Sequence, residues 1–180
     1  MTQADAITFI AESALQPDSD PKILLILNQE VNILCNTSWQ WNTVILDLER
    51  DIDNKFFVGT DVLHCVAIYP SIDVEVDSSG YLYDRELQSS TFDYKVLRVM
   101  LVKLLSFDDL PVIAQEYILA SSQIQYQGLI NGQSEVNQFL FSRKQEMDLK
   151  LKQMENKRKK PSMLNGHLDA FQALNSYRRF

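Results

Sequence analysis

The sequence has few of the residues from which metal centres and reactive sites are built. It contains only two cysteines and two histidines in 180 residues. His64 and His167 are far apart, and neither Cys35 nor Cys65 belongs to a CxxC pair. Sites built from histidine and cysteine need several such residues at short spacings, so we expect no metal site. Unpaired cysteines also argue against a disulfide framework and favour a reducing compartment.

Long apolar runs are absent as well. The most apolar segment, Val96–Phe107, is interrupted by Arg98 and Lys103. It is shorter than the roughly 18 residues that a membrane helix needs. The opening Met-Thr-Gln-Ala-Asp lacks the basic and apolar regions of a secretion signal. We therefore expect a soluble, intracellular product with no membrane partner.

The familiar catalytic signatures are missing too. The sequence contains no GxSxG, HExxH, P-loop or GxGxxG pattern. The neighbours His64 and Cys65 suggest a dyad, but on a strand their side chains would point to opposite faces. We expect no enzyme activity and no cofactor.

Charge, by contrast, is plentiful and unevenly distributed. The net charge is −7, yet residues 1–110 hold 18 acids and 7 bases, whereas residues 111–180 hold 6 acids and 10 bases. An acidic front argues against wrapping nucleic acid, because phosphate binding needs concentrated positive charge. Opposite charge at the two ends favours head-to-tail association of copies.

Hydrophobic periodicity predicts helices at both ends of the chain. Apolar residues recur there at spacings of three and four, as in helices with one buried face. The predicted helices cover residues 4–15, 21–36, 111–130 and 134–160. Asp20-Pro21 opens the second helix with an N-cap acceptor and a proline at the first helical position. The stripes that we expect to be buried are Ile23, Leu24, Leu27, Val31 and Leu34 in the second helix, Ile113, Tyr117, Ala120 and Ile124 in the third, and Val136, Leu140, Met147, Leu151 and Met154 in the fourth.

Between the helices the apolar period shortens to about two, which predicts β structure. The expected strands are at 64–69 and 95–105, with a hairpin over 73–84. The predicted fold class is α+β: mainly a helical bundle with an inserted antiparallel β region and a long C-terminal helix plus an extended tail. The predicted domains are 1–38 with 108–160 for the bundle, 39–107 for the β insertion and 161–180 for a C-terminal docking tail.

Four acids, Asp47, Glu49, Asp51 and Asp53, form the most enzyme-like group. Strand alternation would place all four on one face, with neighbouring carboxylates about 6.6 Å apart. Paired carboxylates serve glycoside hydrolysis and bind hard cations. A hydrolase needs its two acids on opposite sides of the substrate, so we favour a solvated strand face. A carboxylate-based hydrolase stays as an alternative.

Lys157-Arg158-Lys159-Lys160 is the one dense basic run. It could meet phosphates, so a DNA-binding accessory factor is a second alternative. The favoured explanation is a helix C-terminus, where the helix dipole stabilises each cation by about 0.3–1 kcal/mol. The chain end beyond it holds further candidates for docking onto a partner. These are Met163, Leu164, Phe171, Arg178, Arg179 and Phe180.

Aromatic residues mark two further positions. Trp39 and Trp41, in S-W-Q-W-N, are expected at the joint between helices and sheet. In G-Y-L-Y-D-R-E, Tyr81 and Tyr83 should share one strand face, opposite Leu82 and Asp84. Tyrosines combine rigid area with a polar tip, which favours packing between sheets or between subunits.

Several short motifs follow one another in a characteristic order: I-L-N-Q-E-V-N, S-W-Q-W-N, G-Y-L-Y-D-R-E, T-F-D, F-D-D-L-P, Q-Y-Q-G and P-S-M-L-N-G. From about residue 4 to residue 166, this order resembles the tail tubular protein A family of short-tailed, podovirus-type bacteriophages. The resemblance implies a structural virion protein, a head-to-tail adaptor that forms a dodecameric ring. The ring would join the portal protein to the tail nozzle, which is built from tail tubular protein B.

The resemblance also implies how such a ring would work. Genomic DNA would leave through its channel during ejection without specific binding. The protein would reside in the virion tail after assembly in the host bacterial cytoplasm. The helical bundle and the segment after Pro161 would contact the portal. In addition, we expect Arg85 to pair with a neighbouring carboxylate among Asp47–Asp53.

Overall fold

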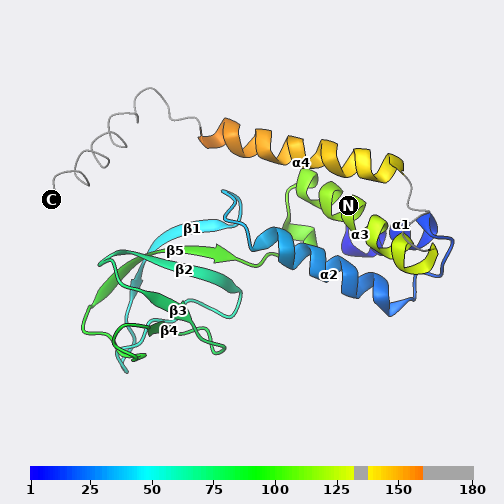
Figure 1. Ribbon diagram of the computed structural model, residues 1–180. Helices are drawn as coiled ribbons and strands as arrows, with labels where there is room; N and C mark the ends of the chain where they lie inside the picture. Colours follow the sequence, from blue (N-terminus) through cyan, green and yellow to red (C-terminus); the bar gives the residue numbers. More distant parts are fainter. Residues whose placement is uncertain (132–137, 160–180) are drawn as a thin grey trace.

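A computed structural model describes residues 1–131 and 138–159 of the chain (Figure 1). Helices lie at both ends of this part and strands lie between them. The elements in chain order are α1 (Gln3–Ser13), α2 (Pro21–Cys35), β1 (Thr43–Glu49), β2 (Val62–Tyr69), β3 (Val74–Val76), β4 (Leu82–Asp84), β5 (Val96–Lys103), the 3-10 turn η1 (Phe107–Asp109), α3 (Val112–Asn131) and α4 (Gln138–Lys159). The predicted α+β class is confirmed.

The predicted elements agree with these bounds to within a few residues. The four helices, the hairpin and the strands at 64–69 and 95–105 are all present. Residues 134–137 and 160 of the fourth predicted helix, and the predicted tail 161–180, lie outside the described residues.

Local side-chain hydrogen bonds explain where the first two helices begin. The Thr2 hydroxyl accepts the backbone N–H of Asp5, and the Asp5 carboxylate accepts the N–H of Thr2, which forms a capping box. Asp20 accepts the N–H of Lys22 at 2.9 Å and precedes Pro21 at the start of α2. Both caps are readable in the sequence.

The four helices pack around one apolar cluster, with α3 in contact with the other three (Figure 1). In the middle of α3 the six consecutive residues 118–123 are all buried, and six consecutive residues point to all sides of a helix. The stripe predicted for α3 is therefore incomplete, because Ile113, Tyr117 and Ile124 are only partly buried and Ala120 alone is fully buried. A helix with three helical neighbours has no single buried face.

The buried stripes predicted for α2 and α4 agree better with the observed burial. In α2 the prediction is wrong only for Leu24, which is 43% exposed; Ile26, two residues further along and on the opposite edge of the buried face, is buried. In α4, Leu140, Met147 and Leu151 are buried as predicted and Met154 is partly buried; Val136 lies outside the described residues. Helix α4 also bonds to α3 through Lys144, whose Nζ donates to the Ser121 Oγ at 2.8 Å.

The β region has a separate apolar cluster. Its three-stranded antiparallel sheet has the order β1-β5-β2, and the β3-β4 hairpin forms a second, two-stranded sheet. The fully buried side chains of the cluster include Phe56, Leu82, Leu97 and Val99. Helices and strands thus bury their apolar residues in two distinct clusters along the chain.

Strand β1 ends at Glu49, which corrects one prediction. Asp51 and Asp53 follow the strand instead of lying on it. The Asp51 carboxylate accepts the backbone N–H groups of Asp53 at 2.9 Å and Lys55 at 2.8 Å and so forms a turn. The prediction of four acids on one strand face is therefore wrong, because this local turn chemistry ends the strand.

The segment S-W-Q-W-N connects α2 to β1. Trp39 and Trp41 stack with ring centroids 6.1 Å apart and pack partly buried against the helical cluster. Asn42 is 1% exposed; its Nδ2 donates to the carbonyls of Cys35 at 2.8 Å and Thr37 at 3.2 Å, and its Oδ1 accepts the Trp39 N–H at 2.9 Å. One amide thus fixes the passage from helix to strand.

Candidate functional site

The predicted carboxylates do not converge on a pocket. Asp47 and Glu49 are exposed on β1, and Asp47 lies 3.8 Å from the Arg98 guanidinium on β5. Such exposed ion pairs add little stability. Over residues 1–131 and 138–159, no cluster of three or more histidine, cysteine, aspartate or glutamate side chains could hold a metal ion. This face of the sheet presents charge to solvent or to a partner.

The G-Y-L-Y-D-R-E stretch has the predicted alternation. Leu82 and Asp84 are buried, whereas Tyr83 is 37% exposed. Tyr81 is partly buried and meets the Phe57 ring edge-to-face, with centroids 5.2 Å apart. Tyr81 therefore packs within its own chain, and Tyr83 is the tyrosine that remains open to contact.

The Arg85 guanidinium does not reach the acids near β1 in the same chain. It lies 3.9 Å from Asp73, which precedes β3, and 3.7 Å from Glu75, which lies on β3. The expected pairing with Asp47–Asp53 is thus wrong within one chain. The antiparallel β3-β4 hairpin places Arg85 beside these two acids.

Sequence reasoning missed the role of Asp84. Its buried carboxylate accepts the backbone N–H groups of Glu86 and Leu87, each at 2.9 Å. The signal was available, because an aspartate at the end of a strand is typical of turns that its side chain closes. Asp84 holds the loop that presents Arg85.

The two thiols lie in surroundings that suppress reactivity. Burial raises the pKa of Cys65 to about 12 and also raises the pKa of Cys35. Successive residues on β2 point to opposite faces: Cys65 packs against the β cluster and His64 is exposed. The geometry provides no dyad between these two side chains.

Only part of the basic run can be located. Lys157 is exposed in the last turn of α4, close to the helix C-terminus. The side chains of Arg158 and Lys159 lie outside the described part. The same holds for Lys160, Met163, Leu164, Phe171, Arg178, Arg179 and Phe180.

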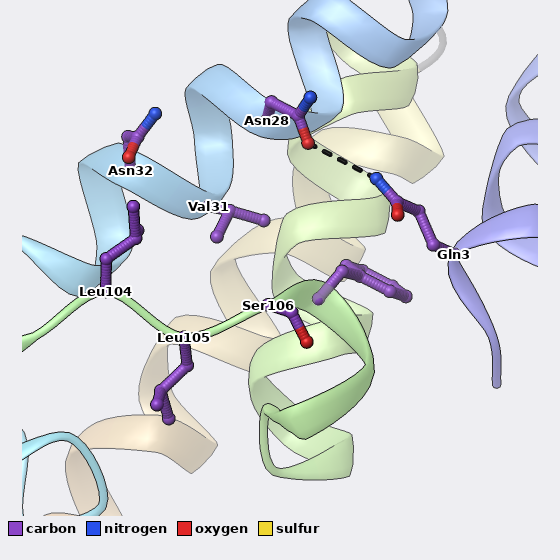
Figure 2. Close-up of a pocket in the computed structure, with 8 residues that line it drawn as sticks. Gln3, Asn28, Val31, Asn32, Leu104, Leu105 and Ser106 are labelled. Atoms are coloured by element: carbon purple, nitrogen blue, oxygen red, sulfur yellow. Dashed lines mark hydrogen bonds between the residues drawn. The ribbon is translucent and has the colours of Figure 1, made fainter. Parts of the chain in front are cut away.

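A polar hollow lies where the helices meet the end of β5 (Figure 2). Gln3 Nε2 donates to Asn28 Oδ1 across it at 3.3 Å, and Asn32 and Ser106 add further polar groups. The other lining residues are Val31, Leu104, Leu105 and Phe107. Because none of these side chains is ionisable, the hollow supplies hydrogen bonds but no acid, base or strong nucleophile.

Two further hollows, both mainly apolar, lie on the sides of the α3-α4 pair, and we call these sides the α2 flank and the α1 flank. The α2 flank is lined by Leu25, Ile26, Gln29, Ile124, Gln125, Gly128, Leu129 and Phe141. The α1 flank is lined by Met1, Phe9, Val112, Gln115, Glu116, Leu119 and Arg143. Clusters of exposed apolar side chains commonly mark contact sites for other proteins.

An α+β protein with exposed apolar flanks and an acidic β region has surfaces of the kind that contact other proteins. The Tube family model, described as tail tubular protein, matches residues 14–161. Because this match spans the strands and most of the helices, the chain belongs to the tail tubular protein family. It is a structural component of a bacteriophage tail and assembles with other components of the virion.

The family match confirms the resemblance read from the order of the motifs. A comparison with curated proteins gives no match. The helices of the described part include no uncharged apolar stretch long enough to span a membrane.

Proposed function

We propose that this protein is a non-enzymatic, ring-forming adaptor that joins the portal to the tail nozzle and lines the DNA ejection path. The observation that carries the proposal is the family match over residues 14–161, which includes both the helices and the β region. In this proposal the protein is assembled in the host cytoplasm and its ring is a dodecamer. Genomic DNA passes through the ring without being bound specifically.

The acidic character of the chain supports this role. The sequence pI is about 4.8, and residues 1–110 hold most of the acids. A conduit must release its cargo, and each phosphate contact adds affinity that would slow the passage of DNA. An acidic wall avoids such contacts.

We assign a different binding partner to each of the two parts of the chain that have their own apolar cluster. The helices of residues 1–38 and 108–160 form one domain and contact the portal together with residues 161–180. The β domain of residues 39–107 faces the nozzle protein and neighbouring copies. Its exposed candidates are Asp47, Glu49, Tyr83 and Arg85.

The hydrolase alternative has lost its geometric support. Asp51 and Asp53 serve a turn after β1, and Asp47 is paired with Arg98. If these acids nevertheless carried catalysis, Asp47→Asn or Glu49→Gln would abolish turnover of a polysaccharide substrate.

The direct test mixes the purified chain with portal rings of the same phage and images the products by electron microscopy. We expect a second ring stacked on the portal, followed by nozzle binding when that protein is added. Portal rings that stay bare would overturn the proposal.

Charge reversal by Arg85→Glu tests the proposed contact of the β domain. We expect fewer complete adaptor rings per portal, with Leu87→Glu, at another exposed position on the same loop, as the control. Unchanged ring formation by Arg85→Glu would remove this residue from the interface.

A further inference from the structure

On both flanks of the helical part, large apolar side chains are exposed to solvent. On the α2 flank, Leu25 is 68% exposed, Leu129 is 65% exposed and Phe141 is 47% exposed. On the α1 flank, Val112 is 66% exposed and Phe9 is 43% exposed. A structural subunit with two such surfaces needs something to cover both of them.

The flanks lie on nearly opposite sides of the α3-α4 pair. Phe141 and Arg143 line different flanks and are two residues apart on α4, which places them about 200° apart around the helix. On α3, residues 124–129 line one flank and residues 112–119 line the other. The same helix pair therefore carries an apolar surface on each side.

We propose that the α2 flank of one copy packs against the α1 flank of the next copy. This inference rests on the proposed ring, for which it supplies the repeating contact. Two different patches on opposite sides of a subunit generate a head-to-tail series, and the series closes into a ring when the rotation per subunit allows it. Covering both flanks with a second protein would require two unrelated contacts.

Charge at the edges of the flanks fits this pairing. Lys22 lies one helical turn before Leu25 on α2 and is exposed. Lys22 is offset by Asp20, whose carboxylate caps α2 two residues earlier. On the other flank, Glu12 lies one turn after Phe9 on α1 and Glu116 lines the hollow, and these acids are offset by Arg143 and by the α-amino group of Met1. Each edge thus carries charges of both signs, so a cation on one flank can meet an acid on the other.

The test uses one substitution on each flank at matched exposure. Leu25→Glu disables the α2 flank and Val112→Glu disables the α1 flank. Leu87→Glu, in the β region at 72% exposure, is the matched control. Because all three residues are exposed, circular dichroism and thermal unfolding should show folded proteins.

Two measurements are made. Electron microscopy follows ring formation on portals, and sedimentation velocity at high protein concentration follows self-association without portals. We expect wild type and Leu87→Glu to assemble, and each flank variant alone to lose assembly by roughly tenfold or more. An equal mixture of the two flank variants retains one intact contact. It should give a one-to-one dimer that cannot grow.

Each other outcome is informative. Assembly by either flank variant alone at the wild-type level would overturn the head-to-tail pairing, and so would a mixture that stays monomeric. If wild type self-associates in solution through the flanks but leaves portals bare, the inference stands and the adaptor function falls. A wild-type chain that remains monomeric in both measurements overturns the inference.

Discussion

At the scale of single residues, three of the aspartates form turns of the β region. Three aspartates each accept two backbone N–H groups from residues just after them: Asp51, Asp77 and Asp84. Each carboxylate thus replaces backbone acceptors that a tight turn cannot provide. The acid count alone did not reveal this, because a solvated acid and a turn-forming acid have the same sequence letter.

Asp84→Ala should destabilise the β region measurably. The side chain is 2% exposed, so its removal leaves the N–H groups of Glu86 and Leu87 without their acceptor. We expect a loss of about 1–3 kcal/mol in the free energy of unfolding, measured by urea denaturation. Asp84→Asn keeps an acceptor oxygen and should cost less. Equal losses for both variants would contradict the role assigned to that oxygen.

Both thiols should react slowly in the folded protein. Burial raises the pKa of Cys65 to about 12 and raises that of Cys35, so the reactive thiolate is scarce near pH 8. Iodoacetamide labelling followed by mass spectrometry should modify neither thiol quickly in buffer and both of them in urea. Because the folded state holds these protons more tightly, stability should also fall as pH rises above the usual thiol range. Rapid labelling of the native protein would refute the assigned environment.

At the scale of elements, the sequence predicted the helices and strands well because their periods differ. Caps such as Asp20-Pro21 were readable, and alternation correctly placed Tyr81 opposite Leu82. The sequence did not show which elements pack against one another in the fold. Helix α3 packs against three helices, so its buried residues do not form the one stripe that periodicity can detect.

The candidate site was predictable in its local part only. Strand alternation and charge predict that Tyr83 and Arg85 face solvent. The contacts of Tyr81 with Phe57 and of Arg85 with Asp73 could not be predicted in this way, because they depend on segments that the fold brings together. The opposed flanks of α3 and α4 were invisible for the same reason, since each flank combines residues from three helices.

Asn42→Ala tests the joint between helix α2 and strand β1. Truncation would leave the Cys35 and Thr37 carbonyls and the Trp39 N–H without their side-chain partner. We expect a loss of about 2–3 kcal/mol in the free energy of unfolding by urea denaturation. Gln40→Ala, at an exposed neighbouring position, is the matched control and should change little.

Asn42→Asp refines this test. The new carboxylate keeps the acceptor for Trp39 but loses both donors and buries a charge. Burial would raise its pKa above that of the unfolded chain, so the deficit should be largest at pH 7 and shrink as the pH falls and the group becomes protonated. A deficit that does not change with pH would show that the site is open to water.

At the scale of the whole molecule, the charge pattern and the apolar flanks assign different tasks to different surfaces. The flanks are apolar and lie on the helices, whereas most of the acids lie in the front 110 residues. Apolar contacts persist at high salt, whereas contacts between exposed charges are screened over about 10 Å at 0.1 M salt. Ring formation through the flanks should therefore survive salt concentrations that weaken contacts of the acidic β region.

Duplex DNA binding is the property that best separates a conduit from a DNA-binding factor. The basic run from Lys157 to Lys160 could contact at most a few phosphates, and the net charge of −7 opposes them. Four phosphate contacts would give a slope of roughly −3.6 in a plot of log affinity against log salt. We expect fluorescence anisotropy with a labelled duplex to show no binding at about 0.15 M salt, the physiological ionic strength. Replacing all four bases by glutamine should change nothing. Binding that follows the steep slope and disappears in the glutamine variant would instead make the basic run a phosphate-binding site, because only a site that retains DNA loses affinity in this way.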